Sequence, residues 1–164
     1  MRSRRIAMAT VLMVAVSVSV LDAQAKPDFS GKWVMDPPAS PVATGERGGG
    51  RGGFQPGFGP EFTVKQDAAA VTITRAGQAT PLLYKLDGSE SKNMVTRDGQ
   101  LQEQVAKATW DGNKLVIATV VNFQGNTAEQ RRVLSLDGGN LVIDQTNPGR
   151  GGGGPIKVVY KKVN

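Results

Sequence analysis

The 164-residue sequence contains no cysteine and no histidine. Without Cys there can be no disulfide, no thiolate nucleophile and no iron–sulfur or zinc–thiolate site. Without His the chain lacks the commonest general base and the commonest transition-metal ligand, and a Ser-His-Asp triad cannot be built. We therefore expect no enzymatic activity, no metal site and no cofactor, and a fold that depends on its hydrophobic core alone.

Acidic side chains are few and scattered, with 14 Asp and Glu against 20 Lys and Arg. Five aspartates stand in predicted turns, where a carboxylate caps its own backbone: Asp67, Asp87, Asp98, Asp111 and Asp137. Glu103, Glu129 and Asp144 lie within or beside predicted strands, but nothing in the sequence brings two of them together, as glycoside hydrolysis would require. The turn aspartates are too dispersed to form a calcium loop.

The first 25 residues have the marks of a cleaved signal peptide. Three arginines precede an apolar run at 6–21, and Ala23 and Ala25 supply the small-x-small pattern of a cleavage site. The run is shorter than the roughly 20 residues that a membrane span needs. We predict a signal peptide at 1–25 and an exported single-domain protein at 26–164, periplasmic or extracellular and without a membrane anchor.

Apolar residues of the remaining chain recur at every second position, which is the period of a β-strand. Ten segments show the pattern: 29–35, 62–66, 71–75, 81–86, 92–97, 104–110, 114–121, 128–136, 140–146 and 156–162. Short Asp-Gly and Gly-Asn connectors join them, and these residues tolerate the positive φ angles of tight hairpins. The sequence therefore predicts an all-β fold, an antiparallel up-and-down meander closed into a barrel of about 8–10 strands, since closure removes exposed edges.

The alternation also predicts which side chains face the interior. The apolar set is Trp33, Phe62, Val64, Val71, Ile73, Leu82, Tyr84, Leu86, Leu115, Ile117, Leu134, Leu136, Leu141, Ile143, Ile156, Val158 and Tyr160. Five polar residues share those faces: Gln66, Arg75, Thr119, Arg132 and Gln145. A buried guanidinium must be paired or hydrogen-bonded. Either the arginines face outward in another register, or they pair internally with Glu129, or they anchor an anionic group.

The stretch "DFSGKWVMDPPAS" (28–40) carries Gly31-x-Trp33 at the start of the first strand. It resembles the G-x-W entry motif of lipocalins and related calycins. That resemblance implies that Trp33 plugs one end of the barrel, with Lys161 or Lys162 packed over its ring. Pro37 and Pro38 then end the strand where the chain leaves the rim.

Four segments, "DFSGKWVMDPPAS", "YKLDGSESKN", "ATWDGNKLVI" and "LSLDGGNLVI", are similar in order and spacing to an uncharacterised, lipocalin-like group of small exported bacterial proteins. This resemblance covers about 29–162. It implies a barrel but brings no activity and no binding residues.

Glycine is concentrated in two predicted loops, at 43–60 and 147–155. The segment "ERGGGRGGF" (46–54) resembles an RNA-binding RGG box, but phosphate binding usually needs a larger basic patch, and we expect no nucleic-acid partner. Phe54 and Phe58 could instead fold over a barrel mouth as a lid.

Two functions remain open. The first is an exported non-enzymatic binding protein that holds a small, mostly apolar ligand, with or without an anionic group, at Arg75, Arg132, Tyr84 and Thr119. The second is a cell-envelope interaction or scaffold module whose Gly/Arg-rich loops contact a protein or an anionic polymer. A cavity above about 300 Å³ would favour the first, and a packed interior the second.

Overall fold

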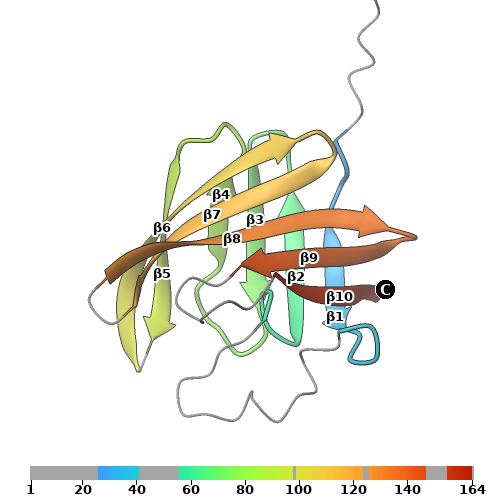
Figure 1. The fold of residues 1–164 in the computed structure, drawn as a ribbon, viewed down its shortest axis with the longest axis horizontal. Helices are drawn as coiled ribbons and strands as arrows, with labels where there is room; N and C mark the ends of the chain where they lie inside the picture. The colour runs from blue at the N-terminus through green and yellow to red at the C-terminus, as the bar shows by residue number, and fades with distance from the viewer. Residues whose placement is uncertain (1–25, 41–55, 98, 124–125, 147–154, 164) are drawn as a thin grey trace, which may run out of the picture.

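Ten antiparallel strands make up the computed structural model, which describes residues 26–40, 56–97, 99–123, 126–146 and 155–163 (Figure 1). The strands are β1 (Gly31–Met35), β2 (Glu61–Gln66), β3 (Ala70–Arg75), β4 (Leu82–Lys85), β5 (Glu90–Arg97), β6 (Gln100–Asp111), β7 (Lys114–Phe123), β8 (Asn126–Asp137), β9 (Asn140–Thr146) and β10 (Ile156–Val163). The described part of the chain contains no helix, and therefore none that is long and apolar enough to cross a membrane.

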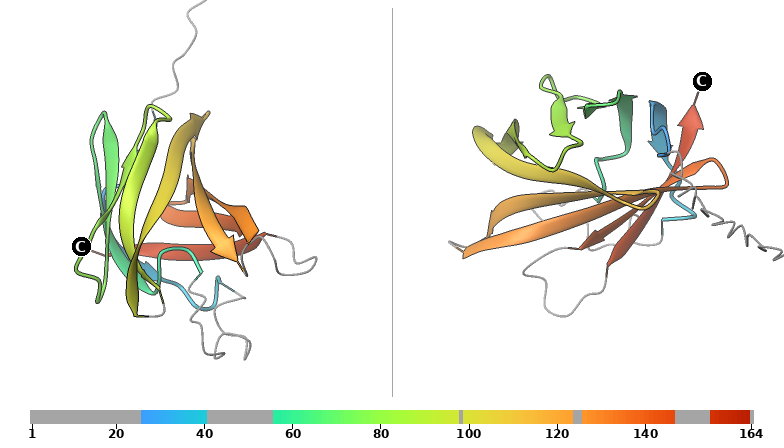
Figure 2. Two further views of the ribbon diagram at one scale, coloured as in Figure 1. Left: turned by 90° about the vertical axis from the view of Figure 1, so that its left-hand side faces the viewer. Right: turned by 90° about the horizontal axis from the view of Figure 1, so that it is seen from above.

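The strands form one sheet in the order β4-β3-β2-β1-β10-β9-β8-β7-β6-β5. Every neighbouring pair but one is also consecutive in sequence. The exception is β1–β10, whose register runs from Lys32 opposite Val163 to Met35 opposite Tyr160. The sheet curls so that β8, β9 and β10 lie across β1, β2 and β3 (Figure 1). The two rotated views show the same curvature of the sheet (Figure 2). The predicted all-β antiparallel meander is confirmed as a nearly closed barrel.

The remaining seam of the barrel lies between β4 and β5, which share no backbone ladder within the described ranges. Side chains of β5 bridge it instead. The Asn93 carboxamide accepts from Leu83 N at 2.7 Å and donates to Leu83 O at 3.0 Å. The Ser91 hydroxyl accepts from Lys85 N at 2.9 Å. Two buried polar side chains thus satisfy the β4 backbone where a strand would otherwise do so.

The up-and-down order gives the barrel two distinct ends. The connections at 67–69, 86–89, 112–113 and 138–139 lie at one end, called here the base, together with the first residues of β1. The strand ends joined by 36–60, 76–81, 98–99, 124–125 and 147–155 lie at the other end, called here the mouth. Both predicted Gly-rich loops therefore connect strands at the mouth.

The inner face carries one apolar cluster that runs through the barrel. Most predicted inward residues belong to it, but Leu136 does not: its side chain is 38% exposed, because it stands one residue before the β8–β9 turn, at the rim. Phe29 and Phe58 are buried members that strand periodicity did not include. Ala106 and Ala108 were missed as well, because β6 has too few large apolar residues to mark its inner face.

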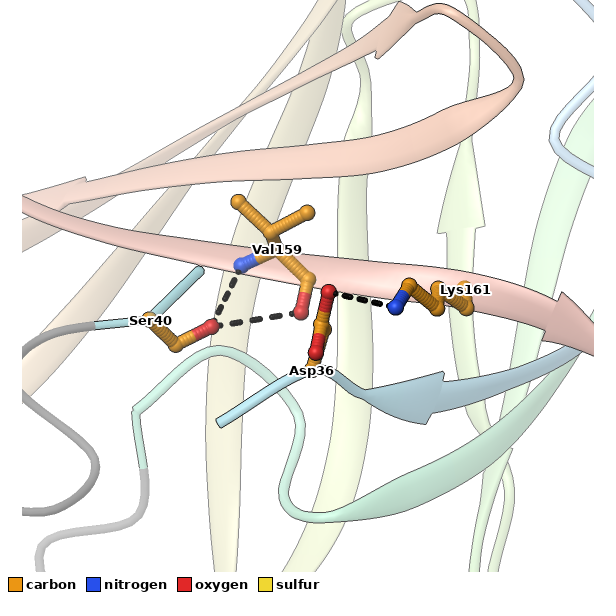
Figure 3. A network of polar contacts seen from close by, with 4 residues as sticks. All are labelled: Asp36, Ser40, Val159 and Lys161. Atoms are coloured by element: carbon orange, nitrogen blue, oxygen red, sulfur yellow. Dashed lines mark hydrogen bonds and ion pairs between the residues drawn. The ribbon is translucent and has the colours of Figure 1, made fainter. Parts of the chain in front are cut away.

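The end of β1 at Met35 follows from two consecutive prolines, which cannot donate backbone hydrogen bonds, as the sequence predicted. Val159 of β10 is left without a strand partner on that side. Asp36 N donates to Val159 O at 2.8 Å, and the Ser40 hydroxyl accepts from Val159 N at 2.9 Å and donates to Val159 O at 3.2 Å (Figure 3). The Ser40 side chain therefore continues the β1–β10 pairing at the rim.

Candidate functional site

Trp33 of β1, the predicted plug of the barrel, is buried. Its indole N–H donates to Phe29 O at 2.8 Å, and Lys162 Nζ lies 5.7 Å from the ring centroid. Lys161, the other cation predicted for this position, instead pairs with Asp36, its Nζ lying 2.9 Å from Oδ2. Gly31 has φ 135°, and a Cβ there would collide with Lys162 Cε, so the glycine leaves room for the lysine to reach the indole. The role of Trp33 as a plug stays a prediction.

The four predicted ligand-binding residues all lie on inner-face positions but come from four strands. Arg75 belongs to β3, Tyr84 to β4, Thr119 to β7 and Arg132 to β8. Tyr84 and Thr119 are fully buried, and both guanidinium groups are close enough to Tyr84 to influence its ionisation. The barrel therefore groups Tyr84 with the two arginines inside an otherwise apolar wall.

Three polar atoms of this group are buried without a hydrogen-bond partner: Arg75 Nε, Tyr84 OH and Thr119 Oγ1. Each such atom costs about 1–3 kcal/mol relative to a satisfied one. The ion pairs among the described residues all involve lysine, so neither guanidinium has a carboxylate partner there. Glu129, the internal partner considered from the sequence, is an odd number of residues from Arg132 and faces outward, exposed.

Burial sets the protonation of this cluster. It raises the pKa of Tyr84, although Arg132 and Arg75 oppose the rise. It raises the pKa of Tyr160 to about 12, against a backbone hydrogen bond at Phe58 and the charge of Arg132. Burial also lowers the pKa of Arg132, but an arginine starts so high that it keeps its charge at neutral pH. The interior is thus cationic and offers neutral phenol donors, which suits an anion.

The turn at 56–60, Pro-Gly-Phe-Gly-Pro, enters the barrel and contacts these donors. The Tyr160 hydroxyl donates to Gly59 O at 3.0 Å and to Pro56 O at 3.3 Å. Arg132 Nε donates to Gly57 O at 3.1 Å and to Gln145 Oε1 at 3.2 Å, and Gly57 N donates to that same Oε1 at 2.8 Å. The sequence predicted Arg132 on the inner face but not the segment that occupies it.

Phe58 at the tip of this turn is 4% exposed, so it packs inside the barrel, whereas the sequence suggested a lid over the mouth. A signal was present, because an aromatic residue between two glycines and two prolines is typical of a fixed tight turn. Phe54, the other half of the predicted lid, and the "ERGGGRGGF" segment lie outside the described residues.

Two of the hollows among the described residues lie beside β6 and β7, which do not pair beyond Ala106 and Thr119. One has a volume of about 160 Å³ and is lined mainly by outward-facing residues, including Val105, Ala118 and Val120. The other has a volume of about 30 Å³. Both are smaller than a typical ligand pocket of about 300 Å³. Neither is lined by Arg132 or Tyr84, next to which the Phe58 turn fills the space.

Comparison with known proteins places the chain by its fold. No protein-family model and no curated protein matches its sequence. A mutant of the REP1-NXSQ fatty acid transporter superimposes with a TM-score of 0.52 at 13% identity, over 82% of this chain and 97% of that one. A mutant of the fluorescent protein UnaG gives a TM-score of 0.51 at 20% identity, over 83% and 96%. The chain therefore shares its fold, a nearly closed antiparallel barrel, with these two proteins. Within the described residues no group of acidic side chains could hold a metal ion.

Proposed function

We propose that the protein is an exported, non-enzymatic binding protein that holds a small, mostly apolar ligand bearing an anionic group inside its barrel. The anionic group would lie among Arg75, Tyr84, Thr119 and Arg132, and the apolar part along the inner wall. Export rests on the leader-like composition of residues 1–25, and the compartment would be the periplasm or the extracellular space.

The observation that carries this proposal is the set of buried polar atoms left without partners. Burial of Arg75 Nε, Tyr84 OH and Thr119 Oγ1 without hydrogen-bond partners lowers the stability of the fold, so stability does not explain why these polar groups are in the interior. A ligand with acceptor oxygens would accept hydrogen bonds from these three groups. The fold supports the same conclusion, because a protein described as a fatty acid transporter shares it.

The filled mouth is the observation that favours the second function, a cell-envelope interaction or scaffold module. Such a protein would need no interior space, and its contacts would come from the Gly/Arg-rich segments, which lie outside the described residues. The two functions differ in whether the barrel takes up a small molecule at all.

Calorimetry with decanoate and decanol tests the binding function, because the two probes share a chain and differ in charge. We expect the protein to prefer decanoate. Arg75→Met keeps the bulk of the side chain, removes the charge and breaks no hydrogen bond at Nε. A charged hydrogen bond is worth about 1.5–3 kcal/mol, so decanoate should bind about tenfold more weakly or worse. Binding of decanol should hardly change.

Arg131→Met is the matched control, because Arg131 is exposed on the outer face of β8. It should leave both affinities unchanged. If neither probe binds the unmodified protein, and native mass spectrometry of protein from its own host shows only the bare mass, the binding function is wrong and the scaffold function is favoured.

A further inference from the structure

The Pro-Gly-Phe-Gly-Pro turn at 56–60 occupies the barrel in the way a ligand would. We infer that the ring of Phe58 occupies the position that a flat aromatic group of the ligand would take. An aromatic carboxylate would then bind by displacing this turn from the mouth. The inference rests on the proposed function and narrows it to a ligand class and a subsite.

The first argument is the shape of the slot around the Phe58 ring. Phe62 meets it edge to face at a centroid distance of 5.4 Å, and Tyr84 lies tilted at 6.3 Å. The Arg132 guanidinium carbon lies 5.1 Å from the ring centroid. Two aromatic walls and a cation over the ring favour a planar π system over a saturated group of the same size.

The second argument is what the turn offers to the surrounding donors. Gly57 O accepts from Arg132, and the carbonyls of Pro56 and Gly59 accept from the Tyr160 hydroxyl. These are neutral acceptors for a buried cation. Carboxylate oxygens would make charge-assisted hydrogen bonds to the same donors, which are shorter and stronger. The ring of Phe58 also contacts Tyr84, whose hydroxyl still has no partner.

The third argument is that the turn can leave without disturbing the sheet. Side chains of β8, β9 and β10 hold it, and its residues belong to no strand ladder. Gly57 and Gly59 have φ 63° and 100°, which a side chain would strain. Pro60 O accepts from Met35 N at 2.8 Å, which fixes the point about which the turn would swing.

The test compares 2-naphthoate with its saturated counterpart, decahydro-2-naphthoate, by titration calorimetry on the full chain and on Phe58→Ala. If the turn competes with the ligand, emptying the slot should tighten 2-naphthoate binding about tenfold, because the apparent affinity is reduced by the fraction of sites that are occupied. The saturated probe should gain by a similar factor, since the same turn competes with both, but should bind more weakly than 2-naphthoate in both proteins because it has no π system to face Phe62, Tyr84 and Arg132. Leu101→Ala, at a side chain 64% exposed outside the barrel, should change neither affinity.

A second variant and a spectroscopic measurement keep the test independent of the stability of Phe58→Ala. Gly57→Ala places a Cβ against the Tyr160 hydroxyl and should expel the turn with its aromatic ring intact, again tightening 2-naphthoate binding. A 4-fluorophenylalanine label at position 58 should move on saturation with 2-naphthoate to the ¹⁹F shift of a solvent-exposed ring.

The outcomes separate this inference from the proposed function. If 2-naphthoate binds but the label does not move, or the saturated probe binds as tightly as 2-naphthoate in Phe58→Ala, the Phe58 subsite is wrong while decanoate binding can still stand. If no variant binds decanoate or either naphthoate probe, both the subsite and the binding function are wrong.

Discussion

The two tyrosines report on the barrel interior more directly than any other residues. The chain has only Tyr84 and Tyr160, and both are fully buried on the inner face. Burial raises the pKa of each phenol, and that of Tyr160 to about 12. Any phenolate absorbance of the native protein therefore comes from the candidate site.

A pH titration of phenolate absorbance should show no ionisation near pH 10 in the native protein, but two ionisations near 10.0 once it is unfolded in urea. Because each folded pKa lies above the unfolded one, the stability that the phenols contribute is complete below about pH 10. The contribution of Tyr160 is lost as the pH rises through about 12, and that of Tyr84 is lost in the same direction. Urea midpoints should therefore fall between about pH 9 and about pH 11. A phenol that ionises near pH 10 in the native state would contradict the buried site.

The period of two was enough to place Arg75, Thr119, Arg132 and Tyr84 on inner positions, because alternation holds along any half-buried strand. It could not say which of their atoms would lack partners. It also could not place Phe58, because a turn has no period and its burial depends on Gln145, Arg132 and Tyr160, all more than 70 residues away.

Among the elements, β5 differs most from what its sequence suggested. Its outward residues include Met94, whereas Ser91 and Asn93 point inward and bond to the β4 backbone. Strand-like character was predicted for 92–97, but its two apolar residues, Met94 and Val95, are adjacent and point to opposite faces, so neither face could be identified as the inner one. The β4–β5 seam could not be predicted either, because tight turns elsewhere in the chain join strands that do pair.

Replacement of Asn93 by leucine should destabilise the barrel by about 1–3 kcal/mol, because it leaves both Leu83 N–H and Leu83 C=O without partners at a partly buried position. Urea unfolding measures the loss, and hydrogen exchange at the Leu83 amide should accelerate. Asn93→Asp should lose less, since a carboxylate can still accept from Leu83 N. Met94→Leu, on the exposed face of the same strand, is the control. An unchanged unfolding free energy for Asn93→Leu would show that the seam does not depend on this side chain.

At the scale of the whole molecule, the barrel depends on a single long-range ladder. The other eight pairings join consecutive strands. Periodicity and turn chemistry were sufficient to predict the pairings made across short turns, whereas β1–β2 and β9–β10 are joined by the longer connections 36–60 and 147–155. The β1–β10 ladder is different, because nothing local specifies it. The sequence indicated it through the general advantage of closing a meander and through the resemblance that placed Lys161 or Lys162 over Trp33.

Because β10 lies beside β1 and the sheet is open between β4 and β5, the chain could be circularly permuted without changing the arrangement of its strands. A circular permutant that links the end of β10 to the start of β1 and opens at Gly88, in the β4–β5 connection, would run β5 to β10 and then β1 to β4, the order in which the strands lie in space. Every ladder, β1–β10 included, would then join consecutive strands, and stopped-flow refolding should be faster than that of the parent chain. Opening instead at Gly112, a similar glycine turn at the same end, separates the paired β6 and β7 and should bring no such gain. Equal refolding rates for the two permutants would show that closure of β1 against β10 does not limit folding.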